Sequence, residues 1–253
     1  MEKNKTLTVA YFSPTEGTKG AAEILAGMLS QNPQYLDLTR RKLRKQKHHF
    51  TEKDLLLAAA PVYGGQLPRL HEELYRNLHG ENTPCILMAA YGNRHYDNTL
   101  AQMQKILEDR GFYCIGAIAP VIPHIYSGKL GNGRPDETDI REFRKFAVTV
   151  KKRLEEDFRE HIELPGEAEP EPKQMKPVAK LWDAEKCNGC QACVQKCPAA
   201  AIDKETYAVD ENLCINCMRC AKVCPADARS YDCGEVQKYL ESNFMERREI
   251  ERF

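Results

Sequence analysis

Eight of the eleven cysteines lie in two runs with identical spacing. The runs are Cys187-x2-Cys190-x2-Cys193-x3-Cys197-Pro198 and Cys214-x2-Cys217-x2-Cys220-x3-Cys224-Pro225. Thiolates at this spacing bind cubane iron-sulfur clusters, because three cysteines of a run can hold one cube while the fourth belongs to the other cube. We therefore predict two [4Fe-4S] centres: a first cluster site of Cys187, Cys190, Cys193 and Cys224, and a second cluster site of Cys214, Cys217, Cys220 and Cys197.

The two runs form an internal repeat, in which Cys214 corresponds to Cys187. Such a repeat predicts a short unit with two-fold pseudo-symmetry. Between the runs, residues 200–210 show the apolar, polar and apolar pattern of a small hairpin. Zinc is the alternative ligand, because Cys-x2-Cys pairs also form zinc sites. Zinc needs pairs, whereas both runs here have four members and end in Cys-Pro, and residues 179–233 resemble bacterial-type ferredoxins with two [4Fe-4S] clusters.

The length of 253 residues allows one good-sized domain and a smaller one. Cys85 and Cys114 lie in apolar runs and are expected to be buried, while Cys233 is given no role. The formal net charge is zero, so the overall charge indicates no partner. We expect a cytoplasmic protein without a membrane span, because the thiolates require a reducing compartment and neither a long apolar stretch nor a signal-peptide pattern occurs.

The N-terminal part alternates apolar, strand-like runs with helical periods. Two of the strand-like runs are continuously apolar, as expected for parallel strands that are buried on both faces. The fold class that follows is α/β, with a doubly wound, five-stranded parallel sheet whose ligands bind at the carboxyl ends of the strands. The expected strands are 6–12, 35–38, 55–60, 85–90 and 112–119, and the expected helices are 21–29, 68–78, 98–110 and 136–157.

Three loops follow expected strands and therefore meet at the carboxyl edge of the sheet. They are residues 13–18, 61–65 and 91–97. The first joins a strand to a helix, so that its amides and the helix N-terminus favour a phosphate group. The hydroxyls of Ser13, Thr15 and Thr18 can add hydrogen-bond donors.

Three sequence segments resemble a family of flavodoxin-ferredoxin fusion proteins: PVYGG at 61–65, YGNRHYD at 91–97 and GRPDETD at 133–139. The resemblance covers nearly the whole chain and implies a flavodoxin-like domain with FMN as its cofactor. It places the phosphate on the first loop and the isoalloxazine ring between the other two. The residues it marks for FMN are Ser13, Thr15, Gly17, Thr18, Lys19, Pro61, Tyr63, Gly64, Tyr91, Gly92, Asn93, Tyr96 and Asp97.

Glu16 departs from the family pattern, in which the phosphate loop usually has glycine. Its carboxylate either lies near the phosphate, partly offset by Lys19, or points to solvent. Among the tyrosines, Tyr96 is the first candidate to stack on the flavin because its loop is otherwise polar. Tyr63 is the second, and Tyr91 closes an apolar strand where core packing serves equally well.

The expected boundaries are a flavodoxin-like domain at 1–163, a linker rich in proline and glutamate at 164–178, and a ferredoxin-like domain with a C-terminal helix at 179–253. Residues 40–47 form a basic run, which we place away from the cofactor edge. It is either a solvated loop or a docking site for an acidic redox partner. Nucleic acid is not an expected partner, because no aromatic residues interleave with the basic ones.

We expect an electron-transfer protein that links one-electron and two-electron partners, because clusters carry single electrons whereas a flavin takes one or two. No nucleophile or general base is indicated, so no catalytic residue is predicted and a carrier is favoured over a stand-alone oxidoreductase. One alternative is a flavin-dependent reductase of a small substrate such as a quinone, fed by the clusters. The other is an iron-sulfur module whose flavodoxin domain holds no flavin.

Overall fold

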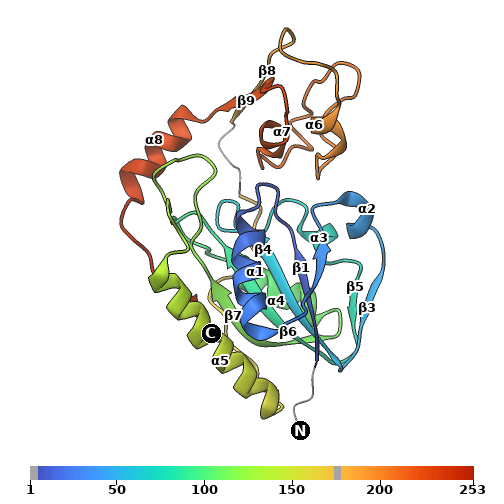
Figure 1. The fold of residues 1–253 in the computed structure, drawn as a ribbon, viewed down its shortest axis with the longest axis vertical. Helices are drawn as coiled ribbons and strands as arrows, with labels where there is room; N and C mark the ends of the chain where they lie inside the picture. The colour runs from blue at the N-terminus through green and yellow to red at the C-terminus, as the bar shows by residue number, and fades with distance from the viewer. Residues whose placement is uncertain (1–4, 174–177) are drawn as a thin grey trace.

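The computed structural model describes residues 5–173 and 178–253. It contains a larger α/β unit and a smaller unit, which lies above the larger one in Figure 1. The larger unit has five parallel strands, in the spatial order β2, β1, β4, β6, β7. Numbered along the chain this is the order 2-1-3-4-5 of flavodoxin-like sheets, so the predicted fold class is confirmed. The bounds are β1 Thr6–Tyr11, β2 Gln34–Asp37, β4 Asp54–Pro61, β6 Thr83–Ala90 and β7 Phe112–Ala119.

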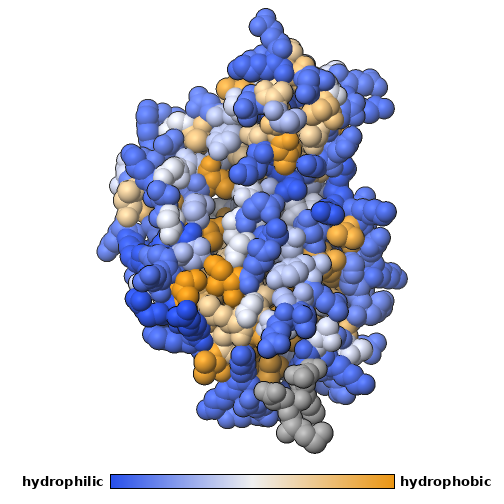
Figure 2. Space-filling view, viewed as in Figure 1, coloured by the Kyte–Doolittle hydropathy of each residue, from blue (hydrophilic) through white to orange (hydrophobic). Residues whose placement is uncertain are grey.

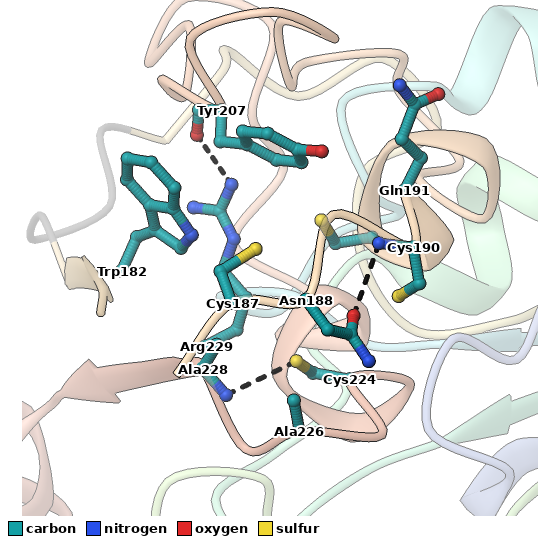
Figure 3. Close-up of a pocket in the computed structure, with 11 residues that line it drawn as sticks. Trp182, Cys187, Asn188, Cys190, Gln191, Tyr207, Cys224, Ala226, Ala228 and Arg229 are labelled. Carbon is teal, nitrogen blue, oxygen red and sulfur yellow. Dashed lines mark hydrogen bonds between the residues drawn. The ribbon is translucent and has the colours of Figure 1, made fainter. Parts of the chain in front are cut away.

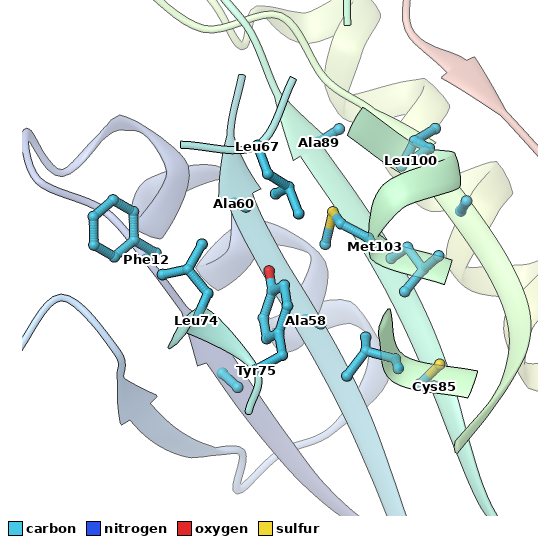
Figure 4. Packing of buried hydrophobic residues seen from close by; sticks show 14 of the residues in the cluster. Phe12, Ala58, Ala60, Leu67, Leu74, Tyr75, Cys85, Ala89, Leu100 and Met103 are labelled. Atoms are coloured by element: carbon cyan, nitrogen blue, oxygen red, sulfur yellow. The ribbon is translucent and has the colours of Figure 1, made fainter. Parts of the chain in front are cut away.

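Helices cover both faces of this sheet. On one face, α1 (Gly17–Leu29) and α5 (Glu137–Glu155) bury apolar residues such as Leu25 and Phe143 against β1, β4 and β6. On the other face, α4 (Thr99–Glu108) buries Leu100 and Met103, as Figure 4 shows. The continuous apolar runs of β4 and β6 are buried because neither face of either strand meets water.

The helix expected at 68–78 is wrong in its extent. Only α3 (His71–Leu74) is helical there, and β5 (Leu78–Gly80) follows it. β5 pairs with β3 (His48–Phe50) in a two-stranded parallel sheet that the sequence pattern did not indicate. Tyr75 and Leu78 are fully buried, so packing against the larger unit decides the backbone of this segment rather than its helix propensity.

The smaller unit contains the two cysteine runs. Each run carries one short helix, α6 (Ala192–Gln195) or α7 (Arg219–Lys222). β8 (Ala179–Trp182) and β9 (Arg229–Asp232) pair in antiparallel fashion, and the expected hairpin is present as an antiparallel bridge between Ile202 and Val209. α8 (Gly234–Asn243) follows Cys233, as predicted, and packs its Leu240 with Tyr126 and Leu130 of the larger unit.

The chain returns to the larger unit after α8. β10 (Glu251–Arg252) adds an antiparallel sixth strand beside β7. The expected boundary at 179–253 did not anticipate this, because the structure places Glu251–Arg252 in the sheet of the N-terminal unit. Within the expected linker, residues 164–173 lie along the larger unit, where the Glu171 carbonyl accepts a hydrogen bond from Gln66, and residues 174–177 lie outside the described residues.

The face of the molecule in Figure 2 is mostly hydrophilic, with small and separate apolar patches. No helix among the described residues is both long enough and apolar enough to cross a membrane.

Candidate iron-sulfur and flavin sites

The four cysteines of the predicted first cluster site line one pocket of the smaller unit. Figure 3 shows Cys187, Cys190 and Cys224 around it, with Trp182, Tyr207 and Arg229 gathered on the side of Cys187. Cys224 comes from the second run, so the structure brings together the crossed set that the spacing predicts. In the described part of the chain, including this pocket, no group of three Cys, His or acidic side chains is arranged to hold a single metal ion.

The cysteines of the predicted second cluster site lie deeper. Cys197 and Cys217 are 9% and 7% exposed, whereas Cys190 of the first site is exposed. Burial raises the pKa of the Cys217 thiol to about 12, and it also raises the pKa of Cys214 and Cys220. Such buried thiols ionise when a metal binds, because the metal supplies the compensating positive charge. Cys217 and its neighbour Ile215 pack into the main hydrophobic core of the larger unit.

The first cluster site has a different electrostatic environment. The pKa of the Cys187 thiol is lowered by a hydrogen bond from the Trp182 indole, by the Gly189 amide and by the charge of Arg229. The first site is therefore open to solvent and polar, while the second is buried between the two units.

The second cluster site faces the loops at the carboxyl end of the parallel sheet. The Tyr126 hydroxyl donates to the Asn216 carbonyl at 2.6 Å, and the Arg69 guanidinium donates to the Cys214 carbonyl. Burial, with the nearby Cys217 as the next cause, raises the pKa of Tyr63 well above its usual value. These contacts join residues that are far apart in the sequence, so the spacing within the cysteine runs could not indicate them.

The basic run at 40–47 contributes to the same interface, which corrects its expected position. It follows β2 at the carboxyl edge of the sheet and includes α2 (Arg41–Arg44). Arg44 is 3% exposed and donates to the carbonyls of Leu38 at 2.9 Å and Pro198 at 2.6 Å. One residue of the run therefore binds next to Cys197, while Lys42, Lys45 and Lys47 remain exposed.

The expected phosphate loop joins β1 to the N-terminus of α1. Ser13 and Thr18 are buried, Thr15 is half-buried, and Gly17 begins α1. The hydroxyl of Ser13 accepts a hydrogen bond from the amide of Lys19 at 3.0 Å. Glu16 is the N-cap of α1 but makes no side-chain hydrogen bond to the first turn. Ser13 thus engages one amide of the first turn of α1 while the N-cap side chain engages none, an arrangement that would leave helix amides for a phosphate.

Glu16 points to solvent. Its φ angle is 73° and its side chain is 56% exposed. The positive φ explains why glycine suits this position. The carboxylate lies 3.4 Å from Lys19 Nζ and 3.8 Å from Arg219 Nη1. Two cations therefore offset its charge, and one of them comes from the smaller unit.

The other two loops contact each other. Gly64 and Gly65 follow Pro61, the buried last residue of β4, and both have positive φ angles. A Cβ atom on Gly65 would overlap the carboxylate of Asp97, so only glycine allows the 61–65 loop to approach the 91–97 loop this closely. Asp97 in turn pairs with Lys173 at 3.0 Å. Of the aromatic candidates, Tyr63 alone lies beside the second cluster site.

Tyr96 does not have the position expected of a flavin-stacking residue. It is 1% exposed, and its hydroxyl donates to Glu251 at 2.6 Å. His95 stacks on its ring at 4.6 Å, and Tyr91 contacts it edge-on. Its ring is therefore occupied by core packing beneath the C-terminal segment, and its choice as first stacking candidate stays a prediction that this packing does not favour.

Asn93 and Gly92 also serve the packing of this loop. The Asn93 amide donates to the carbonyls of Phe244 and Glu246 at 2.7 and 2.8 Å, and its oxygen accepts from the amide of Arg248. A Cβ atom on Gly92 would overlap the His124 ring. The sequence signal for this packing is the apolar Phe244, Met245, Ile250 and Phe253 in an otherwise charged stretch.

Residues 180–203 and 207–230 each match a family described as 4Fe-4S binding domain. The chain joins a flavodoxin-like unit to a two-[4Fe-4S] ferredoxin unit. The first identification rests on the strand order, and the second on the two matched segments with their eight cysteines.

No curated protein matches the chain. Solved structures resemble the flavodoxin-like unit at low identity. A flavodoxin of Streptococcus pneumoniae is 16% identical over 58% of this chain and 99% of its own, with a TM-score of 0.42. The two-electron reduced flavodoxin of Megasphaera elsdenii is 15% identical over 58% and 99%, with a TM-score of 0.38. An FMN-dependent NADH-azoreductase of Bacillus anthracis is 9% identical over 60% and 98%, with a TM-score of 0.32.

Proposed function

We propose that the protein transfers electrons between two [4Fe-4S] clusters and an FMN, and so links one-electron and two-electron redox partners. The observation that carries the proposal is the position of the second cluster site against the carboxyl-end loops of the parallel sheet, where such sheets bind ligands. When bound, the clusters supply one-electron chemistry, and the flavin supplies one- or two-electron chemistry.

Eight cysteines would hold the clusters in the crossed arrangement, with Cys187, Cys190, Cys193 and Cys224 in one set and Cys214, Cys217, Cys220 and Cys197 in the other. The shared pocket of the first set and the mutual electrostatic contacts of the second support this assignment. The loop from Ser13 to Lys19 would hold the FMN phosphate through its amides and hydroxyls. Tyr63 is the side chain placed to contact the flavin on the side of the second cluster.

The residues between the second cluster site and the expected FMN site exclude water, and the tyrosines among them keep their hydroxyl protons. Tyr63 is half-buried and Tyr126 is buried at the interface, and desolvation raises the pKa of both hydroxyls. Both side chains therefore stay neutral at physiological pH. Arg69 and Arg44 fix the cysteine-bearing backbone on the flavodoxin-like unit through carbonyl hydrogen bonds. This rigid contact favours a short and constant distance for electron transfer.

The relative exposure of the two cluster sites indicates the order in which electrons would pass between an external partner and the flavin. The first site has the exposed Cys190 and opens to solvent, so an external one-electron partner would exchange electrons there. The second site is covered by the flavodoxin-like unit and would exchange electrons with the flavin. In this arrangement the ferredoxin unit is the connection between the external partner and FMN.

The test is the cofactor content of the chain purified without oxygen. Iron, sulfide and acid-released flavin are measured per chain together with the absorption spectrum. We expect about eight irons and one FMN. About eight irons without flavin, unchanged after addition of FMN, would remove the flavin half of the proposal and leave an iron-sulfur module with a docking domain.

A further inference from the structure

The two cluster sites are equivalent in backbone structure. The amide of Ala201 donates to Cys197 Sγ at 3.3 Å, and at the corresponding position of the repeat the amide of Ala228 donates to Cys224 Sγ at 3.3 Å. Each site also has one cross-strand pair beside its fourth cysteine. The pair is Ile202 with Val209 at the second site, and Arg229 with Trp182 at the first. The repeat therefore places Arg229 where the other site has Ile202.

Arg229 is the charged exception in this pseudo-symmetry. It is 5% exposed, close to the 7% of Ile202, so it occupies a buried and largely apolar position. Its Nη2 donates to the Tyr207 carbonyl at 2.5 Å, and its guanidinium carbon lies 5.8 Å from the centre of the Trp182 ring. Figure 3 shows the guanidinium between these two side chains and beside Cys187.

Within the described part of the chain, no carboxylate neutralises the charge of Arg229. Across residues 5–173 and 178–253 no carboxylate forms an ion pair with it, and its buried Nε has no hydrogen-bond partner. A buried and unpaired cation is costly unless something compensates it. Arg229 lines the pocket of the first cluster site, where four thiolates around an iron-sulfur cube would provide negative charge.

Such a cation affects the two oxidation states of a cluster differently. Reduction adds one electron, and therefore one negative charge, without the transfer of a proton or the loss of a ligand. A nearby positive charge and an N–H donor stabilise the more negative state, so the reduction potential rises. Ile202 offers neither a charge nor a donor to the second site. Lys180, the cation near Cys214 of that site, is paired with Glu211. The charge of Arg229 also acts on Cys220 of the second site, but its side chain lines the pocket of the first.

We propose that Arg229 separates the reduction potentials of the two clusters, so that the first cluster is reduced before the second. The inference rests on the cluster half of the proposed function and does not depend on FMN. The one-electron reductant in its test is dithionite, which supplies the electron that each cluster gains.

The experiment is a potentiometric titration of the full chain, purified without oxygen and followed by electron paramagnetic resonance. The wild type should show two midpoints. Arg229→Ile introduces the residue of the equivalent position. It should lower the upper midpoint potential by at least about 59 mV, which corresponds to a tenfold change in the equilibrium of a one-electron reduction. Arg229→Lys keeps the charge and should retain most of the separation.

Lys204→Gln is the matched control, because it removes a cation of the same unit whose side chain is 71% exposed. It should leave both midpoints in place. Unchanged midpoints in Arg229→Ile with about eight irons per chain would overturn the inference. If Arg229→Ile lost the first cluster, the titration would be repeated with Arg229→Gln. Midpoints equal to those of the wild type in Arg229→Gln would also overturn the inference. Absence of iron from the wild type would instead refute the proposed function.

Discussion

Arg219 Nη1 donates a hydrogen bond to the carbonyl oxygen of Pro14 at 2.7 Å, across the boundary between the two units. Arg219 lies between Cys217 and Cys220, two residues of the second cluster site, and Pro14 lies in the phosphate loop. The segment that would hold a cluster therefore also touches the loop that would hold the flavin phosphate. Assembly of the second cluster site would therefore also position Pro14 of the phosphate loop.

Arg219→Ala should weaken FMN binding about tenfold, because the guanidinium no longer holds the Pro14 carbonyl of the phosphate loop or adds positive charge near that loop. Riboflavin, which has no phosphate, should bind as it does to the wild type. Flavin fluorescence quenching measures both affinities. Arg141→Ala, on the exposed face of α5, is the control. An equal loss for FMN and riboflavin would show that Arg219 only supports the fold.

Glu16→Gly should strengthen FMN binding and stabilise the flavodoxin-like unit by about 1 kcal/mol, because glycine adopts a positive φ without the cost that other residues incur. Glu16→Gln separates the two effects. It removes the charge but keeps the backbone cost, so affinity should rise while stability does not. Urea unfolding and flavin titration measure the two quantities, and a Glu16→Gly variant less stable than Glu16→Gln would contradict the argument.

Stability should fall between pH 6.5 and pH 4 because of His124. Burial lowers the pKa of this imidazole to about 4, and its Nδ1 accepts a hydrogen bond from the Tyr126 amide. The unfolded chain then binds a proton that the folded chain does not, so stability rises with pH across this window and is complete above pH 6.5. The loss at pH 5 should be on the order of 1 to 2 kcal/mol.

His124→Asn should flatten this dependence, and His161→Asn, at an exposed position, should preserve it. The measurement is the urea midpoint at about pH 5 and about pH 7.5 under anaerobic conditions. A wild-type slope that persists in His124→Asn would assign the effect to another group.

The exposed part of the basic run is either a solvated surface or a docking site for an acidic redox partner, and charge reversal distinguishes the two. Lys42→Glu, Lys45→Glu and Lys47→Glu together should slow reduction of the chain by an acidic ferredoxin at low ionic strength, and the difference should shrink in about 0.5 M salt. Stopped-flow absorbance gives the rates. Equal rates at low salt would leave the run as a solvated surface.

Arg44→Ala should behave differently from those substitutions. It leaves the buried carbonyls of Leu38 and Pro198 without their donor. We therefore expect a salt-independent loss of about 2 kcal/mol in the free energy of unfolding, measured by urea denaturation at low and high salt. A loss that disappears in high salt would assign the effect of Arg44 to its surface charge.

The sequence predicts the features that depend on local pattern. The apolar runs of β4 and β6 indicate buried parallel strands because each is apolar at consecutive positions, and the cysteine spacing indicates the crossed ligand sets. The polar surroundings of Tyr96 in the sequence did not indicate its burial, because burial of its ring depends on the C-terminal segment returning across the sheet. Nothing near Tyr96 in the sequence signals Glu251 or Phe253.

The position of Arg44 has the same explanation. A run of basic residues is typical of a solvated surface, and the exposed lysines of the run fit that pattern. Arg44 is buried because its guanidinium donates to carbonyls of two separate segments, and only the folded arrangement of both units brings those carbonyls together.

The ferredoxin unit is held to its partner unit at both of its ends. Residues 164–173 lie along Gln66 and Asn98 on entry, and the return segment is held by Asn93 and by β10. The two halves thus form an intramolecular pair with a fixed effective concentration. Dilution of the protein should leave electron exchange between them unchanged and slow only the encounter with an outside partner at the exposed cluster.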